Sequence, residues 1–365
     1  MMAGCYQTNC DWKRIAQNVV LPQQTVLIIG ATDVGKSTFS RFLIERGVAR
    51  GLRVGFVDAD VGQSQVGPPT TIGLKIFSSE TSTETGTEIS VDDGEPDALY
   101  FVGWISPNQH ELQCVTGTQL MVDAARKAGA EFIVIDTTGY IDRGAAIILK
   151  QQKIELIQPD HIICLHRSRE LDAIVTCFDD LDSIQIHRLA PHENVTAKSS
   201  VYRRKHRESC FERYFADAVT EPLPFDQIRG QGSPFFIGRK ANAKELKTIS
   251  ELIEDRVLYA EWGHRLLVVV TPDVLPSLAH SRLKSRLRAI HLVTEVPGYF
   301  ENRLVGLLNA GRELLSVGVI ESVDFSANQF QIRCKQGAVA ETKIVQFGRY
   351  KQDRAETENR DENEE

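Results

Sequence analysis

One run of small, polar and basic residues near the amino terminus has the composition needed to bind phosphate groups. It reads Gly30, Ala31, Thr32, Asp33, Val34, Gly35, Lys36, Ser37 and Thr38, and it fits the Walker A spacing completely. Glycines let the backbone aim its N–H groups at phosphate oxygens, and the N-terminus of a following helix adds partial positive charge. Lys36 is expected to contact the β- and γ-phosphates, and Ser37 to bind a metal ion through its hydroxyl. The run therefore predicts ATP, or else GTP, with Mg²⁺ as cofactors.

Two acidic residues follow the next apolar run along the chain. Asp58 and Asp60 stand two positions apart at the end of the run 53–57, and strand alternation sends both side chains to one side. Ligands bind at the carboxyl edge of an open α/β sheet. We therefore expect one of the two carboxylates to hold a water molecule of the metal ion and the other to meet an incoming hydroxyl. A merely solvated strand end is the alternative.

The elements that must position these residues are predicted by alternating apolar runs and helical stretches. Strands are expected at 25–29, 53–57, 98–102, 132–135 and 161–165, and helices at 37–50 and 109–128. Runs of Val, Ile, Leu and Phe are typical of strands buried on both faces of a parallel sheet. The predicted fold class is α/β: a P-loop NTPase with a mainly parallel sheet, followed by a smaller β-rich α+β domain.

The predicted domain organisation has three parts. Residues 1–230 form the P-loop domain with a short lead at 1–24, residues 231–350 form the β-rich domain, and residues 351–365 form a disordered acidic tail. Polar segments at 78–97 and 190–200 are expected to be loops. The stretch 282–288 places basic residues between leucines, which fits a nucleic-acid-guiding helix and a solvated amphipathic helix equally well.

Composition excludes several classes of function. The chain of 365 residues is 42% apolar and 25% charged, and no stretch of about 18 apolar residues predicts a membrane span. Its seven scattered cysteines and nine histidines show no spacing that is typical of zinc or redox sites. The first residues lack the apolar core of a secretory signal, so a cytoplasmic location is predicted. The net charge of −7 argues against bulk nucleic-acid binding but not against a local basic patch.

The order of several blocks resembles a known family. The P-loop and the block Asp58–Gln63 are similar to those of the polynucleotide 5′-hydroxyl kinases of the messenger-RNA cleavage-factor and ribosomal-RNA-processing type. The block Asp136–Tyr140 resembles the family's Thr-x-Gly-Trp clasp, and Tyr202–Arg207 resembles its Arg-rich lid, expected at about 199–216. With only the lead 1–24 before the first strand, the chain resembles the compact prokaryotic members.

The resemblance implies ATP-dependent phosphorylation of 5′-hydroxyl ends of RNA or DNA, with RNA favoured, in RNA processing or repair. It implies catalytic roles for Lys36, Asp60, Arg203 and Arg207, metal binding by Ser37 and Asp58, and substrate contacts by Gln63, Thr138, Tyr140 and Arg204. The ring of Tyr140 could stack on the terminal base. Arg203 and Arg207 stand four apart, so they would share one helix face and close over the γ-phosphate. No protein partner follows from the sequence.

Two other functions stay open at this stage. The first is a nucleotide-switch ATPase or GTPase in which Asp136 and Gly139 sense the γ-phosphate, although no Asn-Lys-x-Asp segment supports guanine selectivity. The second is a nucleotide-bound scaffold of an RNA-processing complex, which would not need an Arg-rich lid. Trp12 is expected in the core more than over a nucleotide base, and Arg167 and Arg169 in surface ion pairs more than in substrate contacts.

Overall fold

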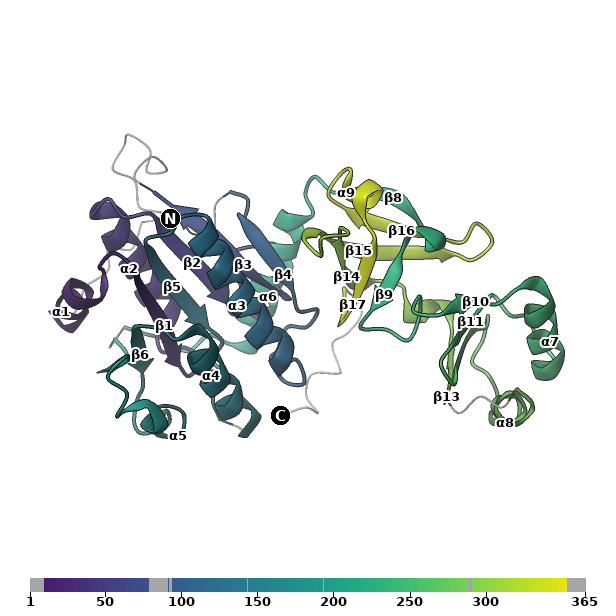
Figure 1. Ribbon diagram of the computed structural model, residues 1–365, viewed down its shortest axis with the longest axis horizontal. Helices are drawn as coiled ribbons and strands as arrows, with labels where there is room; N and C mark the ends of the chain where they lie inside the picture. Colours follow the sequence, from purple (N-terminus) through teal and green to yellow (C-terminus); the bar gives the residue numbers. More distant parts are fainter. Residues whose placement is uncertain are drawn as a thin grey trace. The chain divides into compact units, whose positions relative to one another are not determined.

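The computed structural model describes residues 10–78, 91, 94–142, 144–192, 194–287 and 291–352. The chain divides into two compact units, Met1–Tyr214 and Phe215–Glu365, which differ in colour in Figure 1. The boundary comes before residue 230 because strands β8 (Val219–Pro224) and β9 (Arg229–Gln231) pair within the second unit. The predicted loop at 78–97 and the predicted acidic tail fall mostly outside the described residues.

The first unit is built on one seven-stranded sheet. The strands in spatial order are β4 (Ala98–Phe101), β3 (Thr71–Phe77), β2 (Val54–Ala59), β5 (Phe132–Thr137), β1 (Gln24–Gly30), β6 (His161–Leu165) and β7 (Gln185–Leu189). The five strands from β2 to β7 pair in parallel, and β3 and β4 extend the sheet with antiparallel pairing. The predicted mainly parallel α/β sheet is confirmed.

Helices cover both faces of this sheet (Figure 1). Helices α1 (Cys10–Val19) and α2 (Lys36–Ala49) pack on the face that buries Val26 and Ile28. The other face buries Leu27 and Ile29 beneath α3 (Glu111–Lys127), α4 (Gly144–Ile157), α5 (Asp172–Val175) and the 3₁₀ helix η1 (Thr176–Phe178). Because alternate residues of β1 enter opposite cores, all four residues 26–29 of the strand are apolar. This burial fixes the end of β1, from which the phosphate-binding loop starts.

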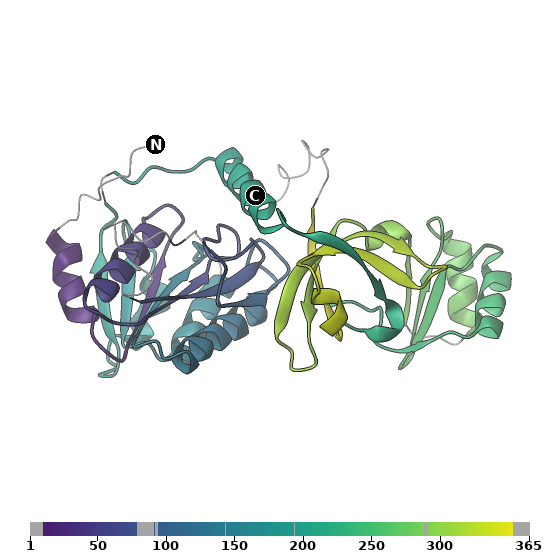
Figure 2. The ribbon, with the colours of Figure 1, turned by 90° about the horizontal axis from the view of Figure 1, so that it is seen from above.

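Helix α6 (Ser200–Tyr214) closes the first unit and lies within the predicted lid. An irregular segment leads to it from the end of β7, and Figure 2 shows both in teal. Only Cys210 and Phe211 of this helix are buried. Most of α6 is therefore exposed, unlike the helices that cover the sheet.

The second unit contains two sheets, which confirms its predicted β-rich character. The larger has the order β8, β16 (Gln329–Cys334), β15 (Leu314–Asp324), β14 (Arg303–Leu308), β17 (Ile344–Lys351) and β9. The smaller has the order β10 (Arg239–Lys240), β11 (Tyr259–Gly263), β12 (Leu266–Val270) and β13 (His291–Glu295). The remaining elements are α7 (Ala243–Ile253), α8 (Ser277–Arg286), α9 (Ala338–Glu341), η2 (Phe225–Gln227) and η3 (Pro297–Tyr299).

Strand β12 separates two apolar cores in the second unit. Val268 and Val270 pack with residues of the larger sheet, whereas Leu267 and Val269 pack under α7 and α8. Helix α8 carries part of the basic stretch noted in the sequence; its Leu283 is buried, and its Arg282 pairs with Glu254 at 2.6 Å. Among the described residues, none of the helices has the length and apolarity that a membrane span needs.

Candidate active site

The Walker A residues form a tight turn between β1 and α2. A side chain at Gly30 would collide with the carbonyl oxygen of Leu165, so the close approach of β6 requires glycine there. Gly35 has a φ of 90°, which glycine adopts without the steric cost of a Cβ. Lys36 is 7% exposed and donates from Nζ to the carbonyl oxygen of Ala31 at 2.7 Å. The lysine therefore folds back over its own loop.

Asp136, at the end of β5, contacts the P-loop directly. Ser37 Oγ donates to Asp136 Oδ2 at 2.7 Å, and the backbone N–H of Thr137 donates to Oδ1 at 2.8 Å. The carboxylate is buried, and burial raises its pKa to about 6 against the lowering effects of Lys36 and the Ser37 hydrogen bond. Burial lowers the pKa of Lys36, while Asp136, Asp60 and Asp33 oppose that shift. Lys36 and Asp136 are thus two buried groups of opposite charge, and each favours the charged form of the other.

Asp58, on the adjoining strand β2, is in register with Asp136 of β5. Its carboxylate accepts hydrogen bonds from a different set of donors. Its donors are the backbone N–H groups of Asp60 (3.0 Å), Gln65 (2.5 Å) and Val66 (3.0 Å) and the hydroxyl of Ser64 (3.2 Å). Burial, followed by Asp136 and Asp60, raises the pKa of Asp58 to about 7. Asp58 does not line the pocket beside the P-loop. Its carboxylate organises the loop after β2, whereas the carboxylate beside Ser37 is that of Asp136. The predicted metal role of Asp58 stays a prediction.

Asp60 lies just beyond the end of β2, on the side of the loop that faces the P-loop pocket. Its Oδ1 accepts hydrogen bonds from the backbone N–H groups of Gly62 and Gln63, both at 3.1 Å. Both Asp60 and Gln63 line the pocket. Of the two acidic residues, Asp60 thus faces the P-loop pocket. Asp58, near the end of β2, is buried and accepts hydrogen bonds from the loop that follows.

The pocket has a volume of about 460 Å³. Its walls come from the P-loop, the loop after β2, Gly139, Trp12, the segment before α6 and Arg203 of α6. Trp12 is 4% exposed and packs edge-on against Phe39, with 4.9 Å between ring centroids, and it also approaches His192 at 6.3 Å. Trp12 therefore belongs to the core, as expected, and also contributes to the pocket wall.

The predicted clasp is fitted tightly against the P-loop. Thr138 is buried and Tyr140 is half-buried. A side chain at Gly139 would collide with the backbone and hydroxyl of Thr32, so only glycine allows the approach. Gly139 lines the pocket, whereas Thr138 and Tyr140 do not.

Asp33 connects the predicted lid to the P-loop. It has a φ of 55°, and its Oδ2 accepts from Arg203 Nη2 at 2.6 Å and from the backbone N–H of Lys198 at 3.0 Å. Gln63 Nε2 donates to the carbonyl oxygen of Arg203 at 3.4 Å, so the loop after β2 also reaches the lid. Among the predicted lid arginines, the structure places Arg203 at the pocket.

The other two predicted lid arginines lie away from the pocket wall. Arg207 is half-buried one turn beyond Arg203, and Arg204 is exposed, with its Nε 3.9 Å from Glu208. Neither contributes to the pocket lining. An exposed pair at that distance contributes little to stability.

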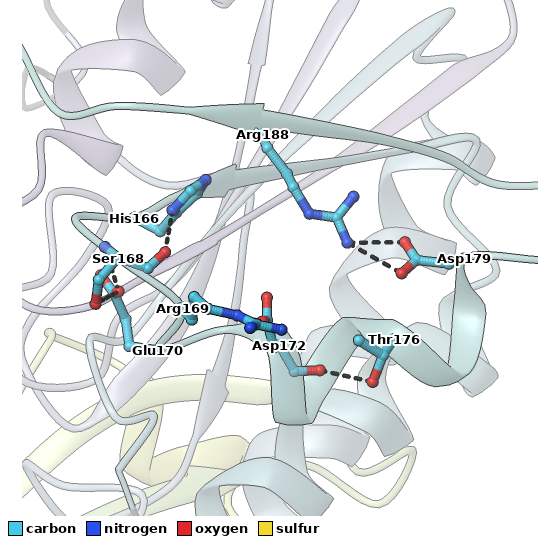
Figure 3. Close-up of polar contacts among 8 residues, drawn as sticks. All are labelled: His166, Ser168, Arg169, Glu170, Asp172, Thr176, Asp179 and Arg188. Atoms are coloured by element: carbon cyan, nitrogen blue, oxygen red, sulfur yellow. Dashed lines mark hydrogen bonds and ion pairs between the residues drawn. The ribbon is translucent and has the colours of Figure 1, made fainter.

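The loop after β6 brings one further arginine to the P-loop. Arg167 donates from Nη2 to the carbonyl oxygen of Asp33 at 2.6 Å. Arg169 instead pairs with Asp172 at 2.6 Å. Figure 3 shows these two residues near Arg188, whose Nη2 donates to both carboxylate oxygens of Asp179. The surface ion pair expected from the sequence is therefore present at Arg169.

Sequence reasoning missed two connections at this site: Asp136 with Ser37, and Asp33 with Arg203. The first has a sequence signal, because Asp136 directly follows an apolar strand, as the metal-side aspartate of P-loop proteins does. The second joins residues far apart in the chain, and no local pattern reveals it.

The fold and the site define a P-loop protein that binds a nucleotide phosphate chain. Residues 30–217 match the family described as the mRNA cleavage and polyadenylation factor CLP1 P-loop. The chain belongs to this family, which confirms the resemblance noted in the sequence.

Archaeal proteins are among its relatives. It is 30% identical to a polyribonucleotide 5′-hydroxyl-kinase of Pyrococcus furiosus, over 89% of this chain and 86% of the relative. It is 32% identical to one of Thermococcus kodakarensis, over 89% of this chain and 87% of the relative. The solved structure of a wild-type Clp1p–Pcf11p complex matches with a TM-score of 0.59 and 12% identity, over 93% of this chain and 78% of that chain. This last likeness shows the shared fold.

Proposed function

We propose that this protein transfers the γ-phosphoryl group of ATP to the 5′-hydroxyl end of RNA. One observation carries the proposal: a single pocket is lined by Lys36, Ser37, Asp60 and Arg203. These are a phosphate-binding lysine, a metal-binding hydroxyl, a candidate proton acceptor and a candidate arginine finger. The archaeal relatives named as polyribonucleotide 5′-hydroxyl-kinases support the same activity over most of the chain.

Ser37 and Asp136 fit a magnesium ion. Both offer hard oxygen ligands 2.7 Å apart, and Mg²⁺ is usually held by one or two protein groups plus water and phosphate oxygens. When bound, the ion would neutralise charge on the terminal phosphates.

Lys36 and the P-loop amides would hold the phosphate chain. For this, the Lys36 ammonium must exchange the carbonyl oxygen of Ala31 for phosphate oxygens. Its electrostatic neighbours Asp136, Asp60 and Asp33 favour the charged form that this role needs.

Asp60 would orient and deprotonate the attacking hydroxyl. The two loop amides that hold its Oδ1 fix the carboxylate at the pocket wall. As the new oxygen–phosphorus bond forms and the bond to the leaving ADP breaks, the hydroxyl proton passes to Asp60. Gln63 lies beside it and is a candidate contact for the RNA end, together with Thr138, Tyr140 and Arg204.

Arg203 would stabilise charge on the transferred group. Its guanidinium is held at the P-loop by Asp33, where its planar fork could contact two phosphoryl oxygens. Arg207 follows on the same helix face and would assist from farther out.

The proposal is tested by incubation with γ-labelled ATP and matched 5′-hydroxyl oligonucleotides of RNA and DNA. Label on the RNA end is expected, with none in a Lys36→Ala variant, which loses the cation at the β- and γ-phosphates. ATP hydrolysis without label transfer would instead favour the nucleotide switch, and ATP binding without turnover would favour the scaffold. The preference for RNA and the cytoplasmic location stay predictions.

A further inference from the structure

Helix α4 carries two lysines that are completely buried in the first unit. Lys150 is 0% exposed and Lys153 is 1% exposed. An isolated ammonium group is costly to remove from water unless hydrogen bonds compensate it. Burial lowers the pKa of both side chains. The burial of these two ammonium groups therefore requires a structural or functional explanation.

The ammonium of Lys150 is directed at the residues that follow Asp136. Its Nζ donates to the carbonyl oxygen of Thr138 at 2.7 Å and to Thr137 Oγ1 at 2.9 Å, and it lies 3.5 Å from Thr138 Oγ1. Thr137 Oγ1 in turn donates to the carbonyl oxygen of Ile28 in β1 at 2.8 Å. One network therefore joins α4, the end of β5 and the strand that leads into the P-loop.

This network lies between two points where the end of β5 meets the P-loop. On one side, Asp136 accepts the hydrogen bond of Ser37. On the other, Gly139 packs against Thr32 so closely that no side chain fits. A shift of the intervening residues would displace one or both contacts.

We propose that Lys150 is a positioning residue that holds residues 137–139 in the geometry the phosphoryl transfer needs. It does not line the pocket, so it acts through Thr137 and Thr138 and not on the reacting atoms. The inference rests on the proposed kinase function and extends it to a residue outside the motifs. Displacements of about 1 Å at a reaction centre can cost about 100-fold in rate.

Lys153 provides a matched control. It lies one turn farther along α4 with nearly the same burial, and its electrostatic neighbours are Cys114, Asp60 and Asp58. Substitution of either lysine by Met removes a buried ammonium from the same helix at nearly constant size. Only Lys150→Met also removes the hydrogen bonds to Thr137 and Thr138.

The experiment compares Lys150→Met with Lys153→Met in the label-transfer assay, together with ATP affinity and thermal unfolding of each variant. Lys150→Met is expected to lower kcat/KM for 5′-hydroxyl RNA about 10- to 100-fold relative to Lys153→Met, with the Kd for ATP within about threefold. Equal kcat/KM values for the two variants would overturn the inference. So would an equal loss of ATP affinity and transfer, because a general loss of folding would produce it.

A second variant keeps the inference testable if Lys150→Met does not fold. Thr137→Val preserves shape and removes one acceptor of the Lys150 ammonium together with the donor to the Ile28 carbonyl. Because both bonds belong to the same network, a loss of the same kind, about threefold to tenfold in kcat/KM, is expected. An unchanged kcat/KM in folded Thr137→Val would overturn the inference. Absence of transfer by the wild-type protein would instead contradict the proposed function, and the inference with it.

Discussion

The ends of β2 and β5 place two aspartates side by side and use them differently. Asp58 and Asp136 are paired in register, and each is 1% exposed. Asp58 accepts four hydrogen bonds from its own loop, whereas Asp136 accepts one from the adjacent Thr137 and one from Ser37 of the P-loop. A position at the ligand-binding edge of a sheet therefore does not by itself place a carboxylate against the P-loop. The hydrogen-bond donors around each carboxylate determine which part of the protein it contacts.

The path of the chain after each strand explains the difference. After β2, the backbone folds back so that the N–H groups of Gln65 and Val66 reach Asp58. After β5, the chain passes alongside the P-loop at Gly139 and leaves Asp136 facing Ser37. The end of β2 reaches the pocket only through the loop beyond it, at Asp60 and Gln63.

The largest effect among the predictions below is expected at Asp60, the acidic residue by which the end of β2 reaches the pocket. Asp60→Asn keeps the shape but cannot accept the hydroxyl proton, so kcat should fall about 10²- to 10⁴-fold. The Kd for ATP, measured by calorimetry, should stay close to that of the wild type. A mild loss in Asp60→Asn would mean that the end of β2 takes no part in the chemistry, and another group would have to accept the proton.

A smaller effect is expected in the lid, which belongs to neither strand end. Arg203→Lys keeps the charge and loses the planar fork, so kcat should fall about tenfold or more while oligonucleotide affinity changes little. Arg207→Lys should show a smaller loss of the same kind. Near-normal kcat with weak, salt-sensitive oligonucleotide binding would make this helix a docking surface.

The smallest effect is a pH-dependent change in stability, and it tests whether Asp58 is the buried group with a raised pKa described above. Burial raises its pKa from 3.8 to about 7, so the folded state holds the proton more tightly than the unfolded state. The stability that this group contributes is full below about pH 4 and is lost as the pH rises through 7. Asp58→Asn cannot titrate, so its stability deficit relative to the wild type should shrink from pH 5 to pH 8 by on the order of 1–3 kcal/mol. A difference in unfolding free energy between Asp58→Asn and the wild type that stays constant from pH 5 to pH 8 would contradict the raised pKa of Asp58.

The apolar central strands and the P-loop could be predicted because their patterns are local. Two strands of the same sheet were missed for physical reasons. β7 lies at an edge with partly exposed side chains, and its residues Gln185–Leu189 are mostly polar. β3 contains Gly73, which is required because a Cβ there would collide with the carbonyl oxygen of Val66. Neither strand shows the continuous apolar run that identifies a strand buried on both faces.

The site could be predicted in its parts but not in its connections. The sequence identified Ser37, Asp60 and Arg203 as candidates, and all three line one pocket. It could not show that Asp33 anchors Arg203, because that contact depends on how the chain folds between them. Nor could strand alternation show which carboxylate faces the P-loop, since the loop after β2 determines it. The roles of these residues stay predictions.

Label transfer by Asp136→Asn and Asp58→Asn, measured across a magnesium titration, tests this account most directly. The two substitutions are identical in chemistry and in register on neighbouring strands. Asp136→Asn is expected to lower kcat at least about 100-fold and to raise the magnesium concentration needed, whereas Asp58→Asn should stay within about fivefold of the wild type. A severe loss in Asp58→Asn with a mild loss in Asp136→Asn would contradict the account.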